Sequence, residues 1–418
     1  MFCRKFTFSL PLLGLCANLI GQTPTDTLRW TLQQADSRFL EKNLLLLANR
    51  SNIDLAQALT QQAKLWDNPV LNTNNNLYNA HDGRAFDSQQ IYVQVQQLLR
   101  LGGKRRRLVA LQQDNERLSA DQFNALLREL HYQIHEDFIN LAIGRQKAAL
   151  YSGELAQLDQ LLQSMRPQAD SGYVAQQELL RIEALAYNLR QDYLALVRDQ
   201  AAGQSELNIL LQLPPDTLVE PQDPGVPAGV ALQLSDLLEK AARSRPELHL
   251  AADQTALAEK NTAYQKALAI PDLNLGLEYD RSSGFAPNLF NVQFSLPLPA
   301  FNRNQGNIRA AQIQARQSAL LLEQTRQQVE QEVVGGYIQF QAMAREIVDN
   351  TPASRFLQSY AAMMGNLLQL FRERRLGLLE FVDQFDAYQQ SQIKRLDSLQ
   401  AYWQAGENLN YVVGEKVF

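Results

Sequence analysis

Three segments of the chain alternate between apolar and polar residues, and this period of two predicts β-strands with one apolar face. They span about 91–96, 273–279 and 291–298, and a less regular segment, NPVLNTNNNLYN, comes before the first. The loops AHDGRAF and RSSGFAP carry glycine or proline, which predicts two hairpins. The apolar positions of the regular strands are Ile91, Val93, Val95, Leu273, Leu275, Leu277, Val292, Phe294 and Leu296.

Long polar segments follow the hairpins and predict helices of unusual length. No proline occurs from Gly103 to Met165, and apolar residues recur there three or four positions apart. About sixty residues at about 1.5 Å each would span about 90 Å, which favours packing against neighbouring helices as in a coiled coil. A second long segment runs from about Ala310 past Tyr360, and Pro352 predicts a kink or break in it.

Each long helix is predicted to end at a glycine and to be followed by a helix that runs back. The first turn, RPQADSGYVAQQ, contains Gly172, and the second, RERRLGLLEF, contains Gly377. Glycine after the last basic residues of a helix is a stop signal. Acids soon after the glycine suit the positive end of the next helix.

The order helix, strand, strand, helix occurs twice, with an offset of about two hundred residues, so that Pro69 matches Pro271 and Gly103 matches Gly306. This predicts a first repeat over 22–215 and a second over 236–418. The Pro- and Gly-rich segment 216–235 between them predicts a surface linker. The strand-to-helix junctions are expected at Gly102, Gly103, Pro297, Pro299 and Gly306, where proline cannot donate to a strand ladder.

The first residues predict a secretory signal peptide over 1–21. Basic Arg4 and Lys5 precede an apolar run, which ends before Gly21. The two cysteines, Cys3 and Cys16, lie in this segment, so the mature chain is expected to lack disulfides. Lipidation of Cys16 stays open. No later segment has eighteen uninterrupted apolar residues, so we expect no transmembrane helix.

Charge and motifs argue against several function classes. With 39 basic and 44 acidic side chains, the chain has no electrostatic case for nucleic acid. The basic run from Lys104 to Arg107 favours a solvated or headgroup-level cluster. His131 and His135 are four apart on a helix, which favours a solvated face and leaves a weak metal contact as the alternative. Phosphate-loop and nucleophile-elbow motifs are missing, so neither an enzyme nor a cofactor or metal site is predicted.

Four strands cannot stand alone in a bilayer, because open edges would leave backbone groups unpaired in hydrocarbon. Three chains would supply twelve strands, enough for a closed, water-filled barrel. The apolar face would then meet lipid, while Asn274, Glu278, Gln293 and Ser295 would line the interior. Tyr279, Phe290 and Phe301 are candidates for an interfacial aromatic belt.

The chain resembles the TolC-like outer-membrane efflux protein family over nearly all of its mature length. QQLLRLGGKRRRLVA, IPDLNLGLEYD and SLPLPAFNRNQGNIRAAQ are similar to stretches of its CzcC/CusC-like heavy-metal branch. The resemblance implies a mainly α-helical fold. A long antiparallel helical tunnel would project into the periplasm, and four strands per chain would join a trimeric twelve-stranded barrel. It also implies a homotrimer in the outer membrane of a Gram-negative bacterium, a periplasmic adaptor and an inner-membrane pump as partners.

The resemblance also assigns residues at the helix tips. The adaptor would contact Gly172, Tyr173, Leu376, Gly377 and Leu378, and Glu178, Asp383 and Asp386 would be acids at the periplasmic aperture. Asp383 and Asp386 are three apart and share a helix face. In a trimer they would form a ring of six carboxylates that attracts cations. The alternative, that they are early-helix acids facing the helix dipole, stays open.

These observations predict a passive exit duct of a tripartite efflux system for heavy-metal cations. A duct for drugs or other small molecules is the alternative cargo assignment. A soluble periplasmic coiled-coil scaffold or adaptor is the alternative from another class. Such an adaptor would not need strands that pair an apolar face with a polar one.

Overall fold

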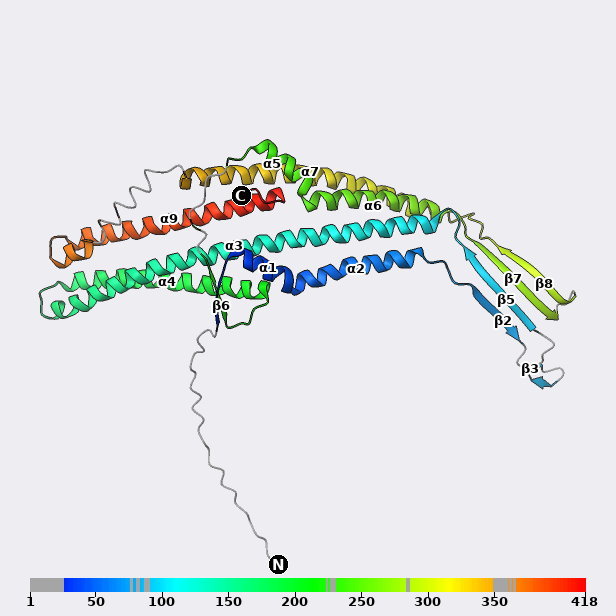
Figure 1. The fold of residues 1–418 in the computed structure, drawn as a ribbon, viewed down its shortest axis with the longest axis horizontal. Helices are drawn as coiled ribbons and strands as arrows, with labels where there is room; N and C mark the ends of the chain where they lie inside the picture. Colours follow the sequence, from blue (N-terminus) through cyan, green and yellow to red (C-terminus); the bar gives the residue numbers. More distant parts are fainter. Residues whose placement is uncertain are drawn as a thin grey trace, which may run out of the picture.

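The computed structural model describes residues 26–75, 78–79, 83–85, 91–222, 225, 231–282, 286–348, 360, 363 and 366–418. The expected signal peptide, Cys16 and Pro352 lie outside these residues. The molecule is a long rod with a β-sheet at one end (Figure 1). At the other end are two turns that connect antiparallel helices, one between α3 (Lys104–Asp170) and α4 (Gln176–Leu211) and one before α9 (Leu378–Val413), and we call these the turns.

The sheet contains the four predicted strands in two hairpins. These are β2 (Val70–Asn75), β5 (Ile91–Leu99), β7 (Leu273–Ser282) and β8 (Pro287–Ser295), all antiparallel in the order β2-β5-β7-β8. The hairpins join through β5 and β7, where Val95 lies opposite Leu277. A short ribbon of β3 (Tyr78–Asn79) and β4 (Arg84–Ala85) extends from the first hairpin.

Each strand is continued by one helix. α2 (Leu44–Lys64) leads into β2, β5 leads into α3 (Lys104–Asp170), α6 (Pro246–Leu268) leads into β7, and β8 leads into α7 (Gln305–Val348). α2 packs on α3, α3 on α6 and α6 on α7. The helices therefore form a wall in the same order as the strands (Figure 1).

The longest helix, α3, has 67 residues and spans about 100 Å at about 1.5 Å per residue. It runs beyond the expected end at Met165, passes through Pro167 and stops at Asp170, and the Pro167 carbonyl still accepts from Ser171 N at 3.2 Å. Beyond the wall it packs against α4 (Gln176–Leu211) and α9 (Leu378–Val413).

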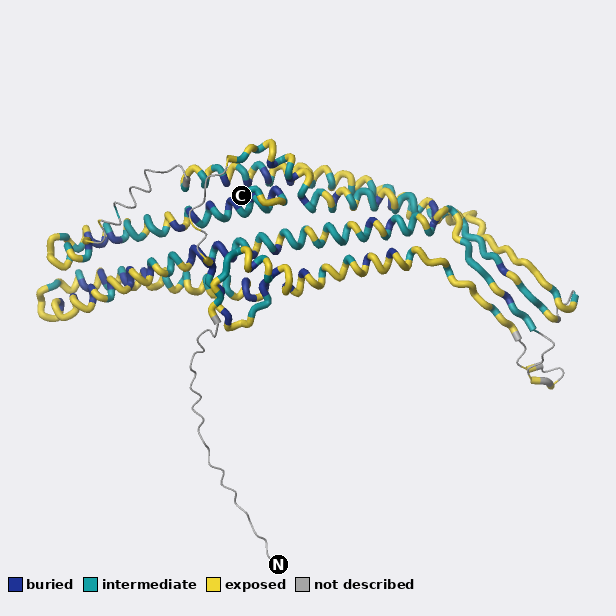
Figure 2. Tube along the Cα trace, in the orientation of Figure 1, coloured by how far each residue is buried: buried dark blue, intermediate teal, exposed yellow. Residues whose placement is uncertain are grey.

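The core of the rod is divided into clusters along its length. One near the turns joins Leu158, Ile182, Phe381 and Phe385 from α3, α4 and α9. Others lie around the middle, where α1 (Leu32–Lys42) and α5 (Leu234–Ser244) cover the long helices. Exposed positions dominate the turns and the outer strands (Figure 2). Among the described residues, no helix has the length and apolar character required to cross a membrane.

The segment 216–235, expected to be a loop, is partly regular structure. Its β6 (Thr217–Pro221) pairs in parallel with β1 (Asp26–Trp30), and α5 begins at Leu234. Thr217 and Val219 of β6 are buried against the rod. The expectation of a loop was therefore wrong over β6, because the strand forms only by pairing with a segment about 190 residues away.

Candidate functional site

One face of the sheet carries a polar network across all four strands. Directly opposite residues of antiparallel strands lie on the same face, which places Asn72, Gln94, Glu278 and Asn291 together. Asn72 donates to Gln94 at 3.3 Å, Gln94 donates to Glu278 at 3.4 Å, and Asn291 donates to Glu278 at 3.2 Å. Gln94, only 4% exposed, also bonds to Gln293. The network gives this face a continuous hydrophilic surface.

Gly276 makes space in that network. A Cβ at this position would lie 3.3 Å from Gln96 Cγ and 3.5 Å from Gln293 Cβ. The missing side chain lets the glutamine amides of β5 reach across β7 to β8, where Gln96 Nε2 donates to Gln293 Oε1 at 3.5 Å. A glycine in the middle of a strand, which is otherwise unfavourable, therefore has a packing reason here.

The opposite face is apolar and exposed. The register aligns Val95, Leu277 and Val292 in one row and sets Phe294 opposite Leu275 in the next. Leu277 is 62% exposed and Phe294 is 68% exposed. The eight expected apolar residues that lie within the strands share this face. Leu296, the ninth, follows the end of β8 at Ser295. Within the described strands, β2 and β8 each have one unpaired edge.

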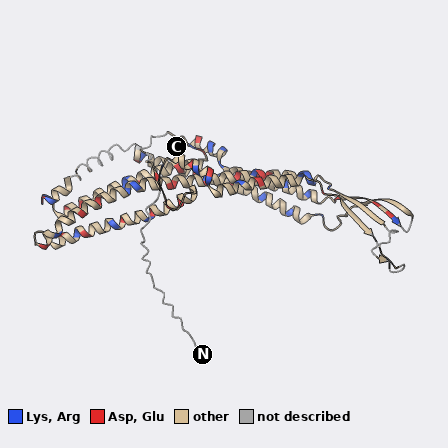
Figure 3. Ribbon diagram, turned by 60° about the horizontal axis from the view of Figure 1, so that its bottom comes forward, with Lys and Arg blue, Asp and Glu red and all other residues tan. Residues whose placement is uncertain are grey.

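The first strand-to-helix junction lies at Gly102 and Gly103, between β5 and α3, where it was expected. Their φ angles are +68° and +69°, in the left-handed region that favours glycine. A Cβ on Gly102 would lie 2.6 Å from Ile270 Cδ1. The buried Lys104 forms an ion pair with Asp272 at 2.7 Å. This contact ties the two hairpins together, and Figure 3 shows Lys and Arg where the helices meet the strands.

At the second junction the position of the turn residue differs from the prediction. β8 ends before Pro297 and Pro299, as their missing donors would require. Gly306, however, lies inside α7, and Asn304 takes the left-handed conformation with φ +57°. Asn304 Nδ2 donates to the Gln265 carbonyl oxygen at 2.8 Å. Asparagine tolerates this conformation, so matching the repeats by their glycines was wrong by two residues.

The two helical turns at the far end also differ from each other. Gly172 ends α3 with φ +78°, as expected. At the second turn, Arg374 holds the left-handed position with φ +57°, while Gly377 is extended and is the N-cap of α9. The expectation that Gly377 ends a helix was therefore wrong.

A contact between the turns accompanies this strained arginine. Arg374 Nη2 donates to the Tyr173 carbonyl oxygen at 2.7 Å. A left-handed residue with a side chain costs about 1–2 kcal/mol, and this bond offsets part of that cost. The contact holds the α3–α4 turn against the turn before α9.

The exposed apolar surface of the turns includes one residue that the sequence did not indicate. Tyr173 is 75% exposed and Leu379 is 69% exposed. Leu376 and Leu378, assigned to adaptor contact by resemblance, are half-buried on the cluster beneath the turns. Leu379 can be identified only once the start of α9 at Leu378 is known. That boundary determines which side chains in the first helical turn of α9 face outward.

The three acids assigned to the aperture take different positions on their helices. Glu178 and Glu380 occupy the same position in the first turns of α4 and α9, so the counterpart of Glu178 is Glu380 and not Asp383. Asp383 is exposed and Asp386 is half-buried. Burial and the neighbouring Asp383 raise the pKa of Asp386, and Arg181 on α4 opposes the rise. This coupling agrees with a shared face for Asp383 and Asp386.

His131 and His135 do not form a solvated face, and that interpretation was wrong. His135, with 19% of its side chain exposed, lies 3.1 Å from Asp36 Oδ1 on α1 and 2.8 Å from Glu407 Oε2 on α9. Burial lowers the pKa of His135, but its bonds to Asp36 and Glu407 outweigh burial and raise it to about 9. The described residues contain no group of ligands arranged to hold a metal ion.

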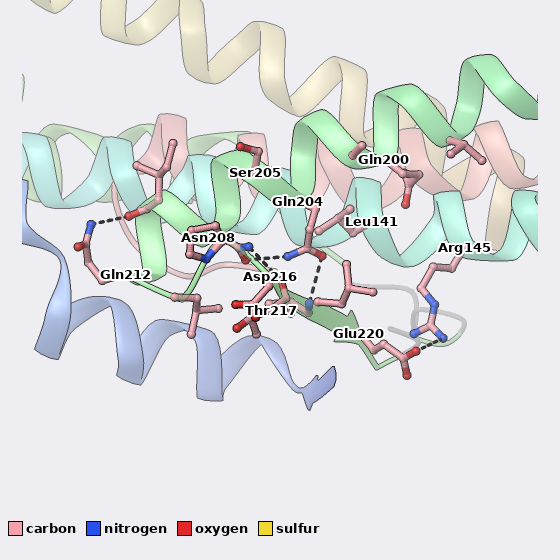
Figure 4. Close-up of a pocket in the computed structure, with 17 residues that line it drawn as sticks. Leu141, Arg145, Gln200, Gln204, Ser205, Asn208, Gln212, Asp216, Thr217 and Glu220 are labelled. Carbon is pink, nitrogen blue, oxygen red and sulfur yellow. Dashed lines mark hydrogen bonds and ion pairs between the residues drawn. The ribbon is translucent and has the colours of Figure 1, made fainter. Parts of the chain in front are cut away.

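A cavity of about 890 Å³ lies between α3, α4 and β6 (Figure 4). Its polar side chains are used to hold β6. Gln204 Oε1 accepts from Val219 N at 3.1 Å, Asn208 Nδ2 donates to the Thr217 carbonyl oxygen at 2.9 Å, and Arg145 pairs with Glu220 at 3.1 Å. We therefore assign these residues a structural role.

Comparisons with known proteins agree with this architecture. The family model for outer membrane efflux proteins matches residues 237–348. The cobalt-zinc-cadmium resistance protein CzcC of Cupriavidus metallidurans is 20% identical over 285 residues. That alignment covers 68% of this chain and 66% of CzcC, slightly less than two thirds of the relative's length.

Solved structures share the fold at low sequence identity. CusC has a TM-score of 0.72 at 18% identity, covering 92% of each chain. The outer-membrane channel OprN has a TM-score of 0.75 at 16% identity, covering 92% of this chain and 89% of its own. The open-state MtrE channel of Neisseria gonorrhoeae has a TM-score of 0.72 at 16% identity with the same coverage.

Proposed function

We propose that this chain, an outer membrane efflux protein with similarity to CzcC and CusC, forms a homotrimeric exit duct across the outer membrane and the periplasm. The observation that carries the proposal is the two-faced sheet with its two unpaired edges. β2 of one copy would pair with β8 of the next, which removes every edge from hydrocarbon. The apolar face would meet lipid, and the network around Gln94 and Glu278 would line water.

The helical wall extends this duct inward. Because the helices keep the order of the strands, three copies of the sheet would continue directly into three copies of the wall. The length of α3, about 100 Å, suits a tunnel that reaches far into the periplasm. The duct is passive, since transport energy would come from an inner-membrane pump.

Cysteine cross-linking tests the closure of the barrel. Thr73→Cys on β2 and Val292→Cys on β8 place thiols on the two outer strands of the sheet, both on the apolar face. A short bis-maleimide should join copies of this double variant into covalent dimers and trimers in outer-membrane fractions. Val93→Cys with Val292→Cys is the matched control and should give fewer links between copies. The reason is that β5 lies between β2 and β7 and is not an edge strand. Recovery of the protein as an unlinked monomer in the soluble periplasm would refute the duct and support the scaffold.

The turns would bind the periplasmic adaptor. Tyr173 and Leu379 present exposed apolar side chains on the two turns, and Gly172 and Gly377 are exposed there, which leaves the backbone accessible. Leu376 and Leu378 would support this surface from below. Tyr173→Ala with Leu379→Ala should abolish co-purification of the adaptor while leaving the trimer intact. Unchanged co-purification would exclude this surface.

Heavy-metal cations are the proposed cargo. Similarity to CzcC and the acids Glu178, Asp383 and Asp386 near the turns support it. Deleting the gene should sensitise the host to cobalt, zinc, cadmium or copper and not to antibiotics, whereas the reverse result would assign small molecules. In planar bilayers, Asp383→Ala with Asp386→Ala should raise conductance and weaken block by divalent cations, as loss of an acidic constriction predicts. Unchanged block would contradict a carboxylate ring.

A further inference from the structure

The zone where strands become helices is strongly basic. We call this zone the collar and define it as residues 64–69, 100–107, 266–272 and 296–309. It contains nine Lys or Arg and two Asp, although the whole chain carries a net charge of −5. Figure 3 shows Lys and Arg in blue where the helices meet the sheet.

The two acids of the collar are already neutralised within it. Asp67 pairs with Arg100 at 2.7 Å, and Asp272 pairs with Lys104 at 2.7 Å. The remaining cations have no carboxylate partner among the described residues. Five of them are exposed, namely Lys64, Arg106, Lys266, Arg303 and Arg309. Concentrated positive charge without carboxylate partners makes the collar a favourable site for an anion from outside the chain.

Large apolar side chains lie among these cations. Trp66 is 64% exposed, and the Arg105 guanidinium stacks 3.9 Å above its ring. Leu298 is 82% exposed and Phe301 is 95% exposed. Leu298 continues the alternation of the sheet's apolar face beyond Phe294. Exposed aromatic and apolar residues interleaved with cations match the chemistry of a membrane interface, where acyl chains meet headgroups.

The helix starts at the collar reinforce this charge. The first turns of α3 and α7 contain no acid, although acids are favoured there by the helix dipole. α3 instead begins with Lys104, Arg105 and Arg106. The positive helix end and the cations repel each other, so a nearby negative surface would stabilise this sequence.

We propose that the collar binds the phosphate headgroups of anionic phospholipids in the periplasmic leaflet of the outer membrane. Arg106, Arg303 and Arg309 contact the phosphates, while Trp66, Leu298 and Phe301 insert at the level of the upper acyl chains. The proposal rests on the proposed function, because it needs the sheet to be in the membrane. It adds a lipid class and the residues that select it.

Native mass spectrometry of the purified protein in detergent tests the lipid class. Phosphatidylglycerol should bind the wild type more tightly than phosphatidylcholine with the same acyl chains. Arg106→Gln with Arg303→Gln and Arg309→Gln should weaken phosphatidylglycerol binding by about fivefold per cation removed and leave phosphatidylcholine binding unchanged. Equal binding of the two lipids by the wild type would overturn the proposal.

A matched triple variant separates location from net charge. Arg198→Gln, Arg243→Gln and Arg326→Gln remove three exposed arginines outside the collar, whose side chains are 78%, 70% and 59% exposed. This control should bind phosphatidylglycerol like the wild type. An equal loss in both triple variants would assign the effect to net charge and refute the collar.

Two further readouts identify the source of any failure. Excess inorganic phosphate, compared with chloride at equal ionic strength, should not displace phosphatidylglycerol, and displacement would show a free-anion site instead. Channel conductance of the same samples in planar bilayers reports on the proposed function. Conducting wild-type channels without a preference for phosphatidylglycerol would refute the collar alone. Failure to insert into any bilayer would refute the duct and the collar together.

Discussion

Glu154 makes stability depend on pH in a way that can be calculated from its surroundings. It lies on α3, is 5% exposed, and neither carboxylate oxygen has a hydrogen-bond partner among the described residues. Tyr151 and Leu158 belong to the same buried part of the rod. Burial raises the pKa of Glu154 from its ordinary 4.5 to about 7. The folded protein therefore holds this proton more tightly than the unfolded chain does.

The sign and size of the effect follow from this difference. A raised carboxyl pKa means that stability is full below the unfolded value and is lost as pH rises toward the folded value. The interval from 4.5 to about 7 corresponds to about 3 kcal/mol. Glu154→Gln keeps the shape and removes the charge. It should raise the free energy of unfolding by about 3 kcal/mol at pH 8.5 and change it little at pH 5.

Denaturant unfolding followed by circular dichroism at 222 nm measures this difference. Wild type, Glu154→Gln and the control Glu323→Gln are compared at both pH values and at one protein concentration. Glu323 has 61% of its side chain exposed, so its variant should follow the wild type. The reasoning is refuted if Glu154→Gln and wild type keep a constant difference across this pH range.

Three other predictions concern the ion-pair cluster, the first junction and the turns. His135→Gln should lower the free energy of unfolding by about 3 kcal/mol at pH 6, because the pKa of His135 is raised to about 9 in the folded protein. The protonated imidazole stabilises the fold fully below pH 6.5. The difference between wild type and variant should therefore vanish above pH 9.5 in the same unfolding assay. Gly102→Ala should lower Tm more than Gly103→Ala, since both have positive φ but only Gly102 would clash with a neighbour; equal losses would contradict this. Arg374→Ala should speed amide exchange around Tyr173, whereas protection equal to wild type would show that their contact carries no stability.

The strands could be predicted from the sequence because their period of two reports directly on a two-faced sheet. The register then places Val95, Leu277 and Val292 in one row, as the alternation required. β1 and β6 could not be found in this way. Each has five residues, and the two segments pair only after the rod has brought them together.

The junctions and turns show where a residue type misleads. Gly103, expected at a junction, and Gly172, expected to end a helix, both hold left-handed positions, but Asn304 and Arg374 hold the corresponding positions in the second half. Asparagine adopts this conformation at low cost, and the arginine is supported by a bond to the other turn. No local pattern identifies such a substitution.

The environment of His135 was also beyond the reach of the sequence. Its partners Asp36 and Glu407 are 99 and 272 positions away. Spacing on its own helix gave only His131, which suggested either solvent or a metal. The charge cluster becomes visible only when α1 and α9 are packed on α3.

Pairing of β5 with β7 also constrains the order of biosynthesis. β5 is complete at Leu99, but its partner begins at Leu273, so about 170 residues must be translated before that edge is covered. An exposed strand edge recruits other chains. In the proposed outer-membrane duct, the first hairpin therefore presents an open edge from its emergence until the second hairpin arrives.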